Sequence, residues 1–412
     1  MLENVKSAEE ARRIKLVEKR RIRNLEFVWT RDAKRSVDDD IEVLGELKPP
    51  NTVLRFKLQG YNSTSFASWM TDIVTYLPNL IAIYLVDIPT CNTLPPLGQL
   101  PNVKFLQITR MDSVRKIDDD LYGGTRAFRL LENFIVEDMK CLEEWDMAPS
   151  CSEDDLQTGQ MDNNRENDDK DLHWESFEDH LRAAWKWLEE FDRRRGEFDS
   201  LKWLFVKDCP KLRFKAGPPK GHILDYKWTV TRSDQVLLSS WGNRGQAGGS
   251  TSTATPRRLV VEHCEVPLHQ WSVLRHLPRL EDLLIRDCSD LTCSSTYLFE
   301  GLSSLKNLTV LDCPSIAALP EQLGDLTSLR TLKIGNCKGI KTLPGSIQKL
   351  TRLQRLEISD CPELTQWFVP EENCVKLPLI KEIEIEGELY VLVNKKSGPE
   401  GDSMTEFDME EI

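Results

Sequence analysis

The chain has 412 residues, of which 40% are hydrophobic and 8% aromatic, a composition that suits a folded protein with a substantial core. Its formal net charge of −13 argues against a general nucleic-acid binder, which needs a basic face to release counterions from phosphates. No stretch approaches the roughly 18–20 apolar residues of a membrane-spanning helix, and the charged N-terminus lacks the apolar core of a signal peptide, so a cytoplasmic protein is expected.

The N-terminal segment, residues 7–23, is rich in Ala, Glu, Lys and Arg and is expected to be helical, because Ala8, Ala11 and Leu16 recur at near-helical spacing. A first strand is expected at residues 22–27. The local surplus of Lys and Arg is most simply the solvated face of a helix, with a docking patch as the alternative.

Four segments that resemble this first strand follow at irregular spacing. Their central residues are Phe56, Ile83, Leu106 and Phe134, at separations of 31, 27, 23 and 28 residues counted from Leu25. The prolines of TLPPLGQLPNV exclude a long helix there and predict a turn or a short 3₁₀ segment. Residues 1–145 are therefore interpreted as a domain of degenerate N-terminal repeats.

The pattern breaks after Trp145. Acidic residues dominate residues 152–179, where few apolar side chains are available to offset the entropy lost on ordering. An apolar stripe at helical spacing comes next. Residues 146–200 are therefore expected to form an acidic disordered insertion followed by an amphipathic helix, which packs either on its own chain or on a partner. The stripe comprises Trp174, Phe177, Leu181, Ala184, Trp185, Leu188 and Phe191.

The strand pattern resumes at Leu201, and residues 201–395 are interpreted as a domain of C-terminal repeats, with a flexible Gly/Ser/Thr-rich loop expected near residues 216–255. The glycines of this loop lack the GK[ST] ending of a phosphate-binding loop, so no nucleotide site is expected there. The acidic residues 396–412 are expected to form a disordered tail.

The clearest pattern lies between Leu305 and Glu363. Its central residues Leu308, Leu332 and Leu356 are 24 residues apart, and the recurring L-x-x-L-x-I-x-x-C at this period is a leucine-rich repeat. One unit cannot bury its own apolar side, so neighbouring units must stack. The sequence predicts an α/β leucine-rich-repeat solenoid, a horseshoe with a parallel sheet on the concave face and irregular, mostly non-helical returns.

Six of the eleven cysteines occupy one slot of the repeat, three residues beyond the last inward-facing strand residue. A small polar side chain in this slot points inward and meets turn backbone. We expect reduced, buried, structural thiols, with disulfides between adjacent repeats as the alternative. Ligands placed one per repeat do not form a tetrahedral cage, so no metal site is expected. The six are Cys209, Cys264, Cys288, Cys313, Cys337 and Cys361.

A cluster of potentially catalytic residues comprises His263, Cys264, His269 and His276. A cysteine nucleophile needs a base within hydrogen-bond reach and a third group that orients this base. Cys264 lies in the inward slot, whereas His263 is expected to face outward. The chain is therefore not predicted to be an enzyme, and no catalytic or cofactor site is expected in it.

The concave strands are the expected binding surface of a solenoid, because the x positions of L-x-x-L-x-L point away from the core in parallel rows. Large aromatic side chains beside Lys and Arg are typical of interface anchors. The alternative is that the helix expected within residues 146–200 covers Trp203 and Phe205. The candidate partner-binding residues are Tyr84, Phe105, Lys202, Trp203, Phe205, Lys207, Arg286, Arg330, Lys333, Arg355 and Glu357.

Several segments together are similar to the leucine-rich-repeat region of plant disease-resistance proteins, the intracellular coiled-coil, nucleotide-binding, leucine-rich-repeat immune receptors. They are residues 2–29, LPPLGQLPNVKFLQI at 94–108, residues 111–117, FRLLENFIVEDMKCLEEW at 128–145, and residues 305–364. The resemblance implies recognition of a pathogen effector or a guarded host protein. It also implies that the region holds the receptor's nucleotide-binding switch domain inactive. The acidic charge and the lack of a long apolar stretch predict that neither nucleic acid nor a membrane is a partner.

The sequence has no GxxxxGK[ST] loop, so ADP or ATP would be bound by the nucleotide-binding domain of a full-length receptor and not by this chain. A fragment, a truncated gene product or a repeat protein that acts alone is expected. Two alternatives from other classes are a substrate-recruiting subunit of a ubiquitin ligase, which needs an F-box-like helical N-terminus, and a free-standing adaptor or decoy without a switch domain.

Overall fold

The computed structural model describes most of the chain. It covers residues 1–30, 37–124, 127–146, 200–215, 226–240, 256–289, 302–369, 380–395 and 406–411, together with Phe299, Asn373 and Leu377. The disordered insertion and the amphipathic helix expected from the sequence fall on residues 147–199, which lie outside the described residues, as do residues 396–405 of the expected tail.

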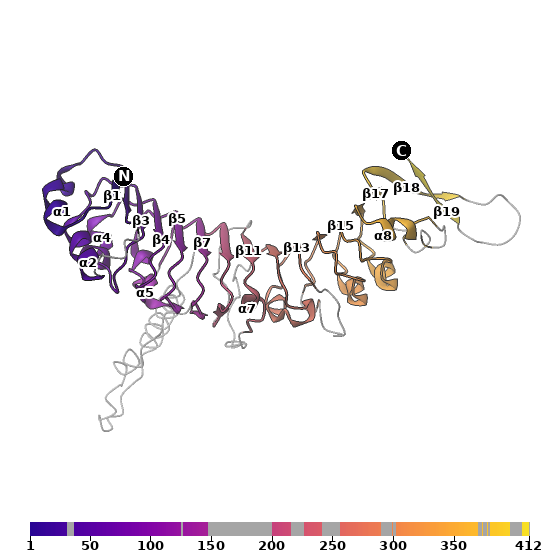
Figure 1. The fold of residues 1–412 in the computed structure, drawn as a ribbon. Coiled ribbons are helices and arrows are strands. Elements are labelled where there is room, and N and C mark those ends of the chain that lie inside the picture. The colour runs from indigo at the N-terminus through magenta and orange to yellow at the C-terminus, as the bar shows by residue number, and fades with distance from the viewer. Residues whose placement is uncertain are drawn as a thin grey trace, which may run out of the picture.

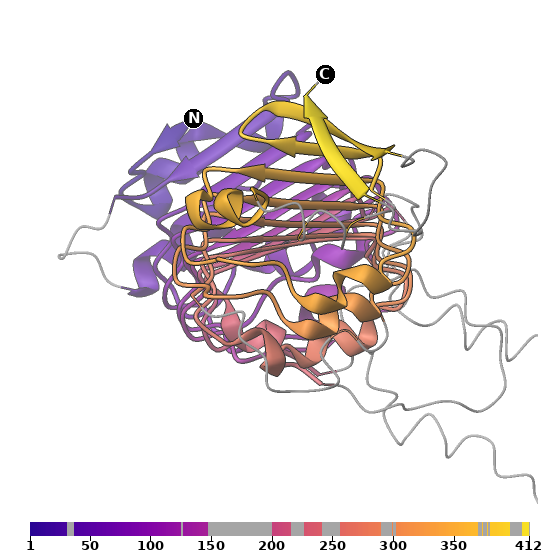
Figure 2. The same ribbon diagram turned by 90° about the vertical axis from the view of Figure 1, so that its right-hand side faces the viewer.

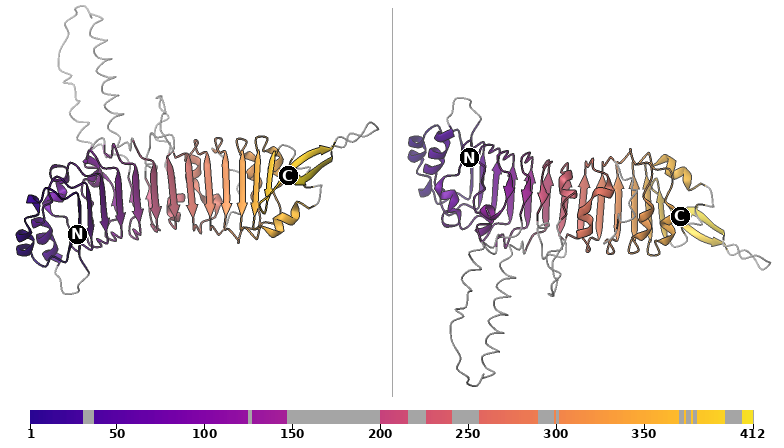
Figure 3. Two further views of the ribbon diagram at one scale, coloured as in Figure 1. Left: turned by 90° about the horizontal axis from the view of Figure 1, so that it is seen from above. Right: turned by 90° about the horizontal axis from the view of Figure 1, so that it is seen from below.

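Within the described residues, a main sheet of 16 strands runs along the molecule (Figures 1 and 3). From β1 to β17 each strand is parallel to the next, and two antiparallel strands close the C-terminal end. The strands are β1 (Leu2–Glu3), β2 (Asn24–Val28), β3 (Arg55–Gln59), β4 (Ala82–Val86), β5 (Phe105–Thr109), β7 (Asn133–Glu137), β9 (Trp203–Lys207), β11 (Lys227–Thr231), β12 (Arg258–Glu262), β13 (Asp282–Arg286), β14 (Asn307–Leu311), β15 (Thr331–Gly335), β16 (Arg355–Ser359), β17 (Glu382–Ile385), β18 (Glu388–Lys395) and β19 (Glu406–Glu411).

Each five-residue repeat strand buries its second and fourth side chains, as Leu308 and Val310 of β14 do. Successive side chains of a strand point to opposite faces, so the first, third and fifth side chains face away from this core. The view along the solenoid shows the returning segments covering one face of the sheet (Figure 2), and the buried side chains of the strands form the core on that face. The predicted leucine-rich-repeat solenoid with a parallel sheet is confirmed.

The returning segments consist of turns, short helices and a small parallel sheet. Proline precedes several 3₁₀ helices, including Pro96 within the TLPPLGQLPNV phrase, as that phrase predicts. The helices are α1 (Ala8–Ile14), α2 (Val37–Glu46), α3 (Ser68–Thr71), α4 (Ile73–Tyr76), α5 (Asp119–Tyr122), α7 (Asp234–Leu237), α8 (Pro362–Trp367), η1 (Leu16–Glu18), η2 (Leu97–Gln99), η4 (Leu268–Gln270), η5 (Ser272–His276), η6 (Glu321–Asp325) and η7 (Gly345–Lys349). The small sheet comprises β6 (Lys116–Ile117), β8 (Glu144–Trp145) and β10 (Arg213–Phe214).

None of the helices in the described part of the chain is both long enough and apolar enough to cross a membrane.

The residue that follows most repeat strands adopts a left-handed backbone, which turns the chain sharply out of the sheet. Asp and Asn tolerate this conformation better than most residues, and they hold most of these positions. After β3 the position is held by Gly60, where a Cβ would lie 1.9 Å from the carbonyl oxygen of Trp29. The other members of this row are Asp87, Arg110, Asp138, Asp208, Arg232, His263, Asp287, Asp312, Asn336, Asp360 and Glu386.

One position further on, the six predicted cysteines lie buried as free thiols. In several repeats the side chain in this slot accepts a hydrogen bond from the backbone N–H of the same slot one repeat earlier. Examples are Cys288 N to Cys313 Sγ at 3.4 Å and Cys337 N to Cys361 Sγ at 3.3 Å. Burial raises the pKa of the Cys209 thiol to about 12, so this thiol is protonated and unreactive at neutral pH.

The prediction of a flexible loop near residues 216–255 is wrong for residues 227–237. Residues 227–231 form β11, which pairs in parallel with β9 on one side and β12 on the other, and α7 follows it. Trp228 takes the buried leucine position, opposite Leu204. The Gly/Ser-rich sequence beside β11 makes this repeat strand difficult to recognise from the sequence.

The expected tail is also wrong in part, because residues 406–411 form β19, which pairs antiparallel with β18. The sheet is continuous across the segment that separates Trp145 from Leu201, since β7 pairs directly with β9. The two repeat blocks expected from the sequence therefore share one sheet, while the domain boundaries assigned from the sequence stay a prediction.

Candidate protein-interaction surface

The third residue of each repeat strand forms a row along the middle of the concave face. Direct strand pairing places these residues side by side from β3 to β17. The row is uncharged and mostly apolar in its central part and charged toward both ends. In order it comprises Lys57, Tyr84, Gln107, Ile135, Phe205, Thr229, Val260, Leu284, Thr309, Lys333, Glu357 and Glu384.

Large half-buried side chains gather where this row crosses β4, β5, β7 and β9. The ring centroids of Tyr84 and Phe105 are 5.1 Å apart, and those of Trp203 and Phe205 are 5.4 Å apart. Ile135 lies on the strand between the two pairs. We call these five residues the aromatic patch; half-exposed aromatic side chains of this kind resemble the anchors of protein interfaces.

Neighbouring polar groups hold Trp203 in place. Its indole Nε1 donates a hydrogen bond to Thr229 Oγ1 at 3.1 Å, and the Lys227 ammonium lies 5.8 Å from its ring centroid. A cation above an aromatic face is attracted by the ring's quadrupole. The side chain is therefore ordered before any partner arrives, which lowers the entropy cost of binding.

The edge of the sheet where the strands begin carries two ordered charge triads. We define this leading edge as the residue before each strand and the strand's first residue. Glu132 lies between Lys104 at 3.1 Å and Lys202 at 2.6 Å. The two lysines, Lys202 more than Lys104, lower the pKa of this carboxyl below its ordinary value. Each triad has two cations and one anion, and so keeps a net positive charge.

The second triad joins Glu281 to Arg257 at 3.1 Å and to Lys306 at 2.8 Å. Lys306, and then Arg257, lower the pKa of Glu281 in the same way. Lys202, a predicted binding residue, therefore belongs to an ion-pair network within the chain. Replacing it changes the protein's own network as well as any contact with a partner.

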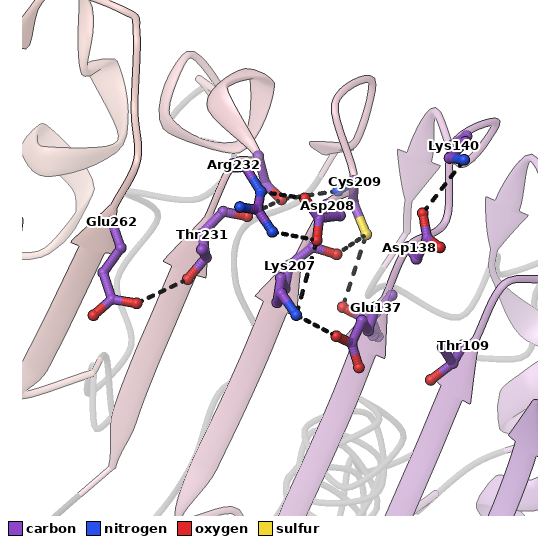
Figure 4. A network of polar contacts seen from close by, with 12 residues as sticks. Thr109, Glu137, Asp138, Lys140, Lys207, Asp208, Cys209, Thr231, Arg232 and Glu262 are labelled. Carbon is purple, nitrogen blue, oxygen red and sulfur yellow. Dashed lines mark hydrogen bonds and ion pairs between the residues drawn. The ribbon is translucent and has the colours of Figure 1, made fainter. Parts of the chain in front are cut away.

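The opposite edge, where the strands end, is held by a second set of polar contacts (Figure 4). We define this trailing edge as the last residue of each strand and the left-handed residue that follows it. Lys207 Nζ lies 2.5 Å from Glu137, and Arg232 donates to Asp208 at 2.5 and 2.9 Å. The Arg232 guanidinium holds the pKa of Asp208 below its usual range.

The other predicted cations are also paired across strands, with one exception. Lys333 pairs with Glu357, and Arg355 lies 2.6 Å from Glu384. Arg286 reaches Asp312 at 3.4 Å. Arg330 is exposed and makes no ion pair with any of the residues that the structure describes.

The histidine and cysteine cluster does not assemble into a catalytic arrangement. His263 Nδ1 lies 2.5 Å from Asp287, whereas Cys264 is 2% exposed and its thiol faces Val266 O at 3.7 Å. His276 belongs to the returning helix η5, where burial lowers its pKa. A groove of about 600 Å³ lies beside the turns after β9 to β14, with Cys264 in its wall. Among the described residues, no group of three or more His, Cys, Asp or Glu could hold a metal ion.

Sequence reasoning missed several members of the concave face. Ile135 occupies an x position of LENFIVEDM, so the repeat rule alone could have found it. Lys227 and Thr229 lie on β11, in a segment whose Gly/Ser-rich composition predicts a loop. Glu132 and Glu137 carry no signal by themselves, since their role depends on cations that pairing brings from neighbouring strands.

Comparisons with known proteins agree with this fold. A family model described as R13L1/DRL21 LRRs matches residues 1–111. The chain is 23% identical over 350 residues to a putative disease resistance RPP13-like protein 1 of Arabidopsis thaliana, an alignment that covers 78% of this chain and 27% of that protein. It is 28% identical over 143 residues to a putative disease resistance protein RGA1 of Solanum bulbocastanum, with 34% of this chain and 14% of that protein covered.

Among solved structures, a Leptospira interrogans leucine-rich-repeat protein, LIC12759, is 15% identical, with 83% of this chain and 91% of that chain covered and a TM-score of 0.25. So low a score adds nothing to the fold described above.

The chain is thus a leucine-rich-repeat solenoid similar to plant disease-resistance proteins, and its relatives support a role in defence-related recognition. It spans about a quarter of the length of the Arabidopsis relative and less of the Solanum one.

Proposed function

We propose that this chain is the recognition region of a plant innate immune receptor of the coiled-coil, nucleotide-binding, leucine-rich-repeat class, acting in the cytoplasm in defence against pathogens. Its concave face binds a pathogen effector or a guarded host protein. In the resting state the same concave face contacts the receptor's nucleotide-binding switch domain and holds it inactive. That domain binds ADP or ATP, and the chain itself catalyses no reaction.

The observation that carries this proposal is the aromatic patch on the concave face. Its side chains are large, half-buried and packed against one another, and they are bordered by charged groups held in ion pairs. Buried hydrophobic residues already fill the core on the other face of the sheet, so packing within the described residues gives no reason for an apolar row on this face. The relatives, all named as disease-resistance proteins, support the biological setting.

Regulation through this region requires that the switch domain and the pathogen-derived partner bind preferentially to different states of the receptor. A ligand shifts an equilibrium only by its difference in affinity for the two states. We propose that recognition weakens the contact between this chain and the switch domain, and so raises the population of the active receptor.

The test is a pull-down of this chain with a separately expressed nucleotide-binding domain of a plant disease-resistance receptor. The double variant Trp203→Ala/Phe205→Ala removes the centre of the aromatic patch. Tyr76→Ala is the matched control, since Tyr76 is a half-exposed aromatic residue of the returning helix α4, away from the concave face.

We expect capture by the wild-type chain and by Tyr76→Ala, and strongly reduced capture by the double variant. Arg330→Glu reverses a charge without breaking an ion pair among the described residues. The same change at Lys202, Lys207 or Lys333 would also break an ion pair within the chain. Failure of the wild-type chain to capture any such domain would contradict the proposal and favour a free-standing adaptor or decoy.

A further inference from the structure

Charge on the concave face is separated across the width of the sheet. At the leading edge, between β3 and β17, Lys and Arg outnumber Asp and Glu. The cations are Arg55, Lys104, Lys202, Lys227, Arg257, Arg258, Lys306, Arg330, Arg355 and Lys381, and the anions are Glu132, Glu281, Asp282 and Glu382.

At the trailing edge, over the same strands, the balance is reversed. The anions are Asp87, Glu137, Asp138, Asp208, Glu262, Asp287, Asp312, Asp360 and Glu386, and the cations are Arg110, Lys207, Arg232 and Arg286. The left-handed backbone after each strand explains part of this excess, because it favours Asp. Local backbone geometry therefore builds an acidic border along the sheet.

Between the two borders runs the uncharged part of the middle row, from Tyr84 on β4 to Leu284 on β13, which is apolar except at Gln107 and Thr229. Parallel strands lie about 4.8 Å apart, so this band is about 30 Å long, the length of a helix of about 20 residues. A five-residue strand extends for about 17 Å, whereas a helix with its side chains is about 10–12 Å wide. A helix centred on the band therefore reaches both charged borders with its flanking side chains.

The band favours a helix over a broad, flat partner because it narrows to a single apolar side chain on β7, β12 and β13, where Ile135, Val260 and Leu284 lie between polar or charged neighbours. An amphipathic helix presents a narrow apolar stripe between two polar flanks, which is the same arrangement. A broad, flat surface would instead cover both charged borders without placing an opposite charge at each of them. Burying charges without partners is costly.

Building on the proposed function, we infer that the partner segment bound by the concave face is an amphipathic α-helix of about 20 residues that lies across the strands, with acidic residues on one flank of its apolar stripe and basic residues on the other. The acidic flank contacts the leading edge, whose two triads keep a net positive charge. The basic flank contacts the row of carboxylates at the trailing edge. The order of the charges fixes the direction in which the helix lies.

The test uses two synthetic peptides of identical composition. In the segregated peptide Glu lies on one flank of a Leu/Ile stripe and Lys on the other; in the mixed peptide Glu and Lys alternate on both flanks. A peptide with its flanks exchanged is no control, because a helix turned end for end presents the same two borders. Circular dichroism checks that both peptides have equal helicity, since Glu–Lys pairs four residues apart stabilise a helix.

We expect the full chain to bind the segregated peptide at least about tenfold more tightly than the mixed one at low ionic strength, a preference that salt reduces. In Lys104→Gln/Lys202→Gln the preference falls toward equality. In Trp203→Ala/Phe205→Ala both peptides bind more weakly. Thermal unfolding of each variant shows whether its fold is retained.

Equal affinity for the two peptides, or no binding of either, overturns the inference. The proposed function is judged separately, by the effect of the aromatic-patch variant on capture of the switch domain. If that capture depends on the patch while neither peptide binds, the partner uses another kind of surface and the recognition role stands. If capture does not depend on the patch, the recognition role itself is contradicted.

Discussion

At the scale of single residues, the repeat is specified by two positions just after each strand. The first needs a left-handed backbone and is most often Asp, and the second supplies a buried acceptor to the repeat before it. The sequence predicts the second position through its recurring cysteine. The first position is harder to recognise, because Arg110, Arg232 and Glu386 adopt a left-handed backbone that these residues do not favour and that the surrounding fold imposes.

Ser233 takes the cysteine slot in the repeat of β11, where its Oγ accepts the N–H of Cys209 at 3.0 Å. Replacing it with Ala leaves a buried N–H without a partner, so we expect a loss of about 1–3 kcal/mol in the free energy of unfolding. Ser233→Cys is the control, because cysteine serves as this acceptor in neighbouring repeats, and its loss should be smaller. Urea unfolding measures both; equal losses would show that the hydrogen bond does not matter.

The charge triads give a prediction about pH. The pKa of Glu281 is lowered in the folded chain from its ordinary value of 4.5. Its contribution to stability is therefore fully present above about pH 4.5 and disappears as the pH falls through the lowered value. We expect Glu281→Gln to destabilise the chain at pH 7 and to differ less from the wild type at pH 3.5. Urea midpoints at the two pH values test this, and a constant difference would contradict it.

At the scale of elements, composition predicts strands well where leucine recurs and fails where another large residue replaces it. Trp228 lies 24 residues after Leu204, the period of the C-terminal repeats, yet the Gly/Ser-rich residues beyond it gave β11 the appearance of a loop. The period was a usable signal, and residue type obscured it. No comparable sequence signal predicts the pairing of β18 with β19, because these antiparallel strands do not belong to the repeat pattern.

The returning segments of two adjacent repeats pack so closely at Gly324 that there is no space for an added methyl group. A Cβ at Gly324 in η6 would lie 2.7 Å from the carbonyl oxygen of Ser346 in the next return, whereas one at Gly345 would have 3.9 Å to its nearest neighbour, Glu321 Oε1. We expect Gly324→Ala to cost about 1–3 kcal/mol through overpacking, and Gly345→Ala to be near neutral. Thermal unfolding of the two variants measures this difference in stability. Equal stability would show that the returning segments can move apart.

At the scale of the whole molecule, the solenoid is one continuous sheet, which the sequence could not establish. The strands on either side of residues 147–199 pair directly in the ordinary register. This follows from stacking, since each strand contacts only its neighbours and the length of a return is not restricted by the sheet. Loop-closure entropy grows only slowly with length, so a long insertion is tolerated.

Excision of residues 151–194 tests this continuity. The return from β10 to β11 uses only residues 215–226, and the link left by the excision has about the same length. We expect the shortened chain to keep the circular dichroism spectrum of the repeats and to unfold at the same or a slightly higher temperature. Loss of the folded state would show that residues 151–194 are needed to join β7 to β9.

The central claim, that the concave face is the recognition surface, is tested most directly by hydroxyl-radical footprinting of the wild-type chain, free and bound to a captured switch domain. We predict that binding protects Tyr84, Phe105, Trp203 and Phe205 from oxidation and leaves Tyr76, on the returning side, as reactive as in the free chain. Protection of Tyr76 without protection of the four concave side chains would place the partner on the other side of the solenoid and contradict the claim.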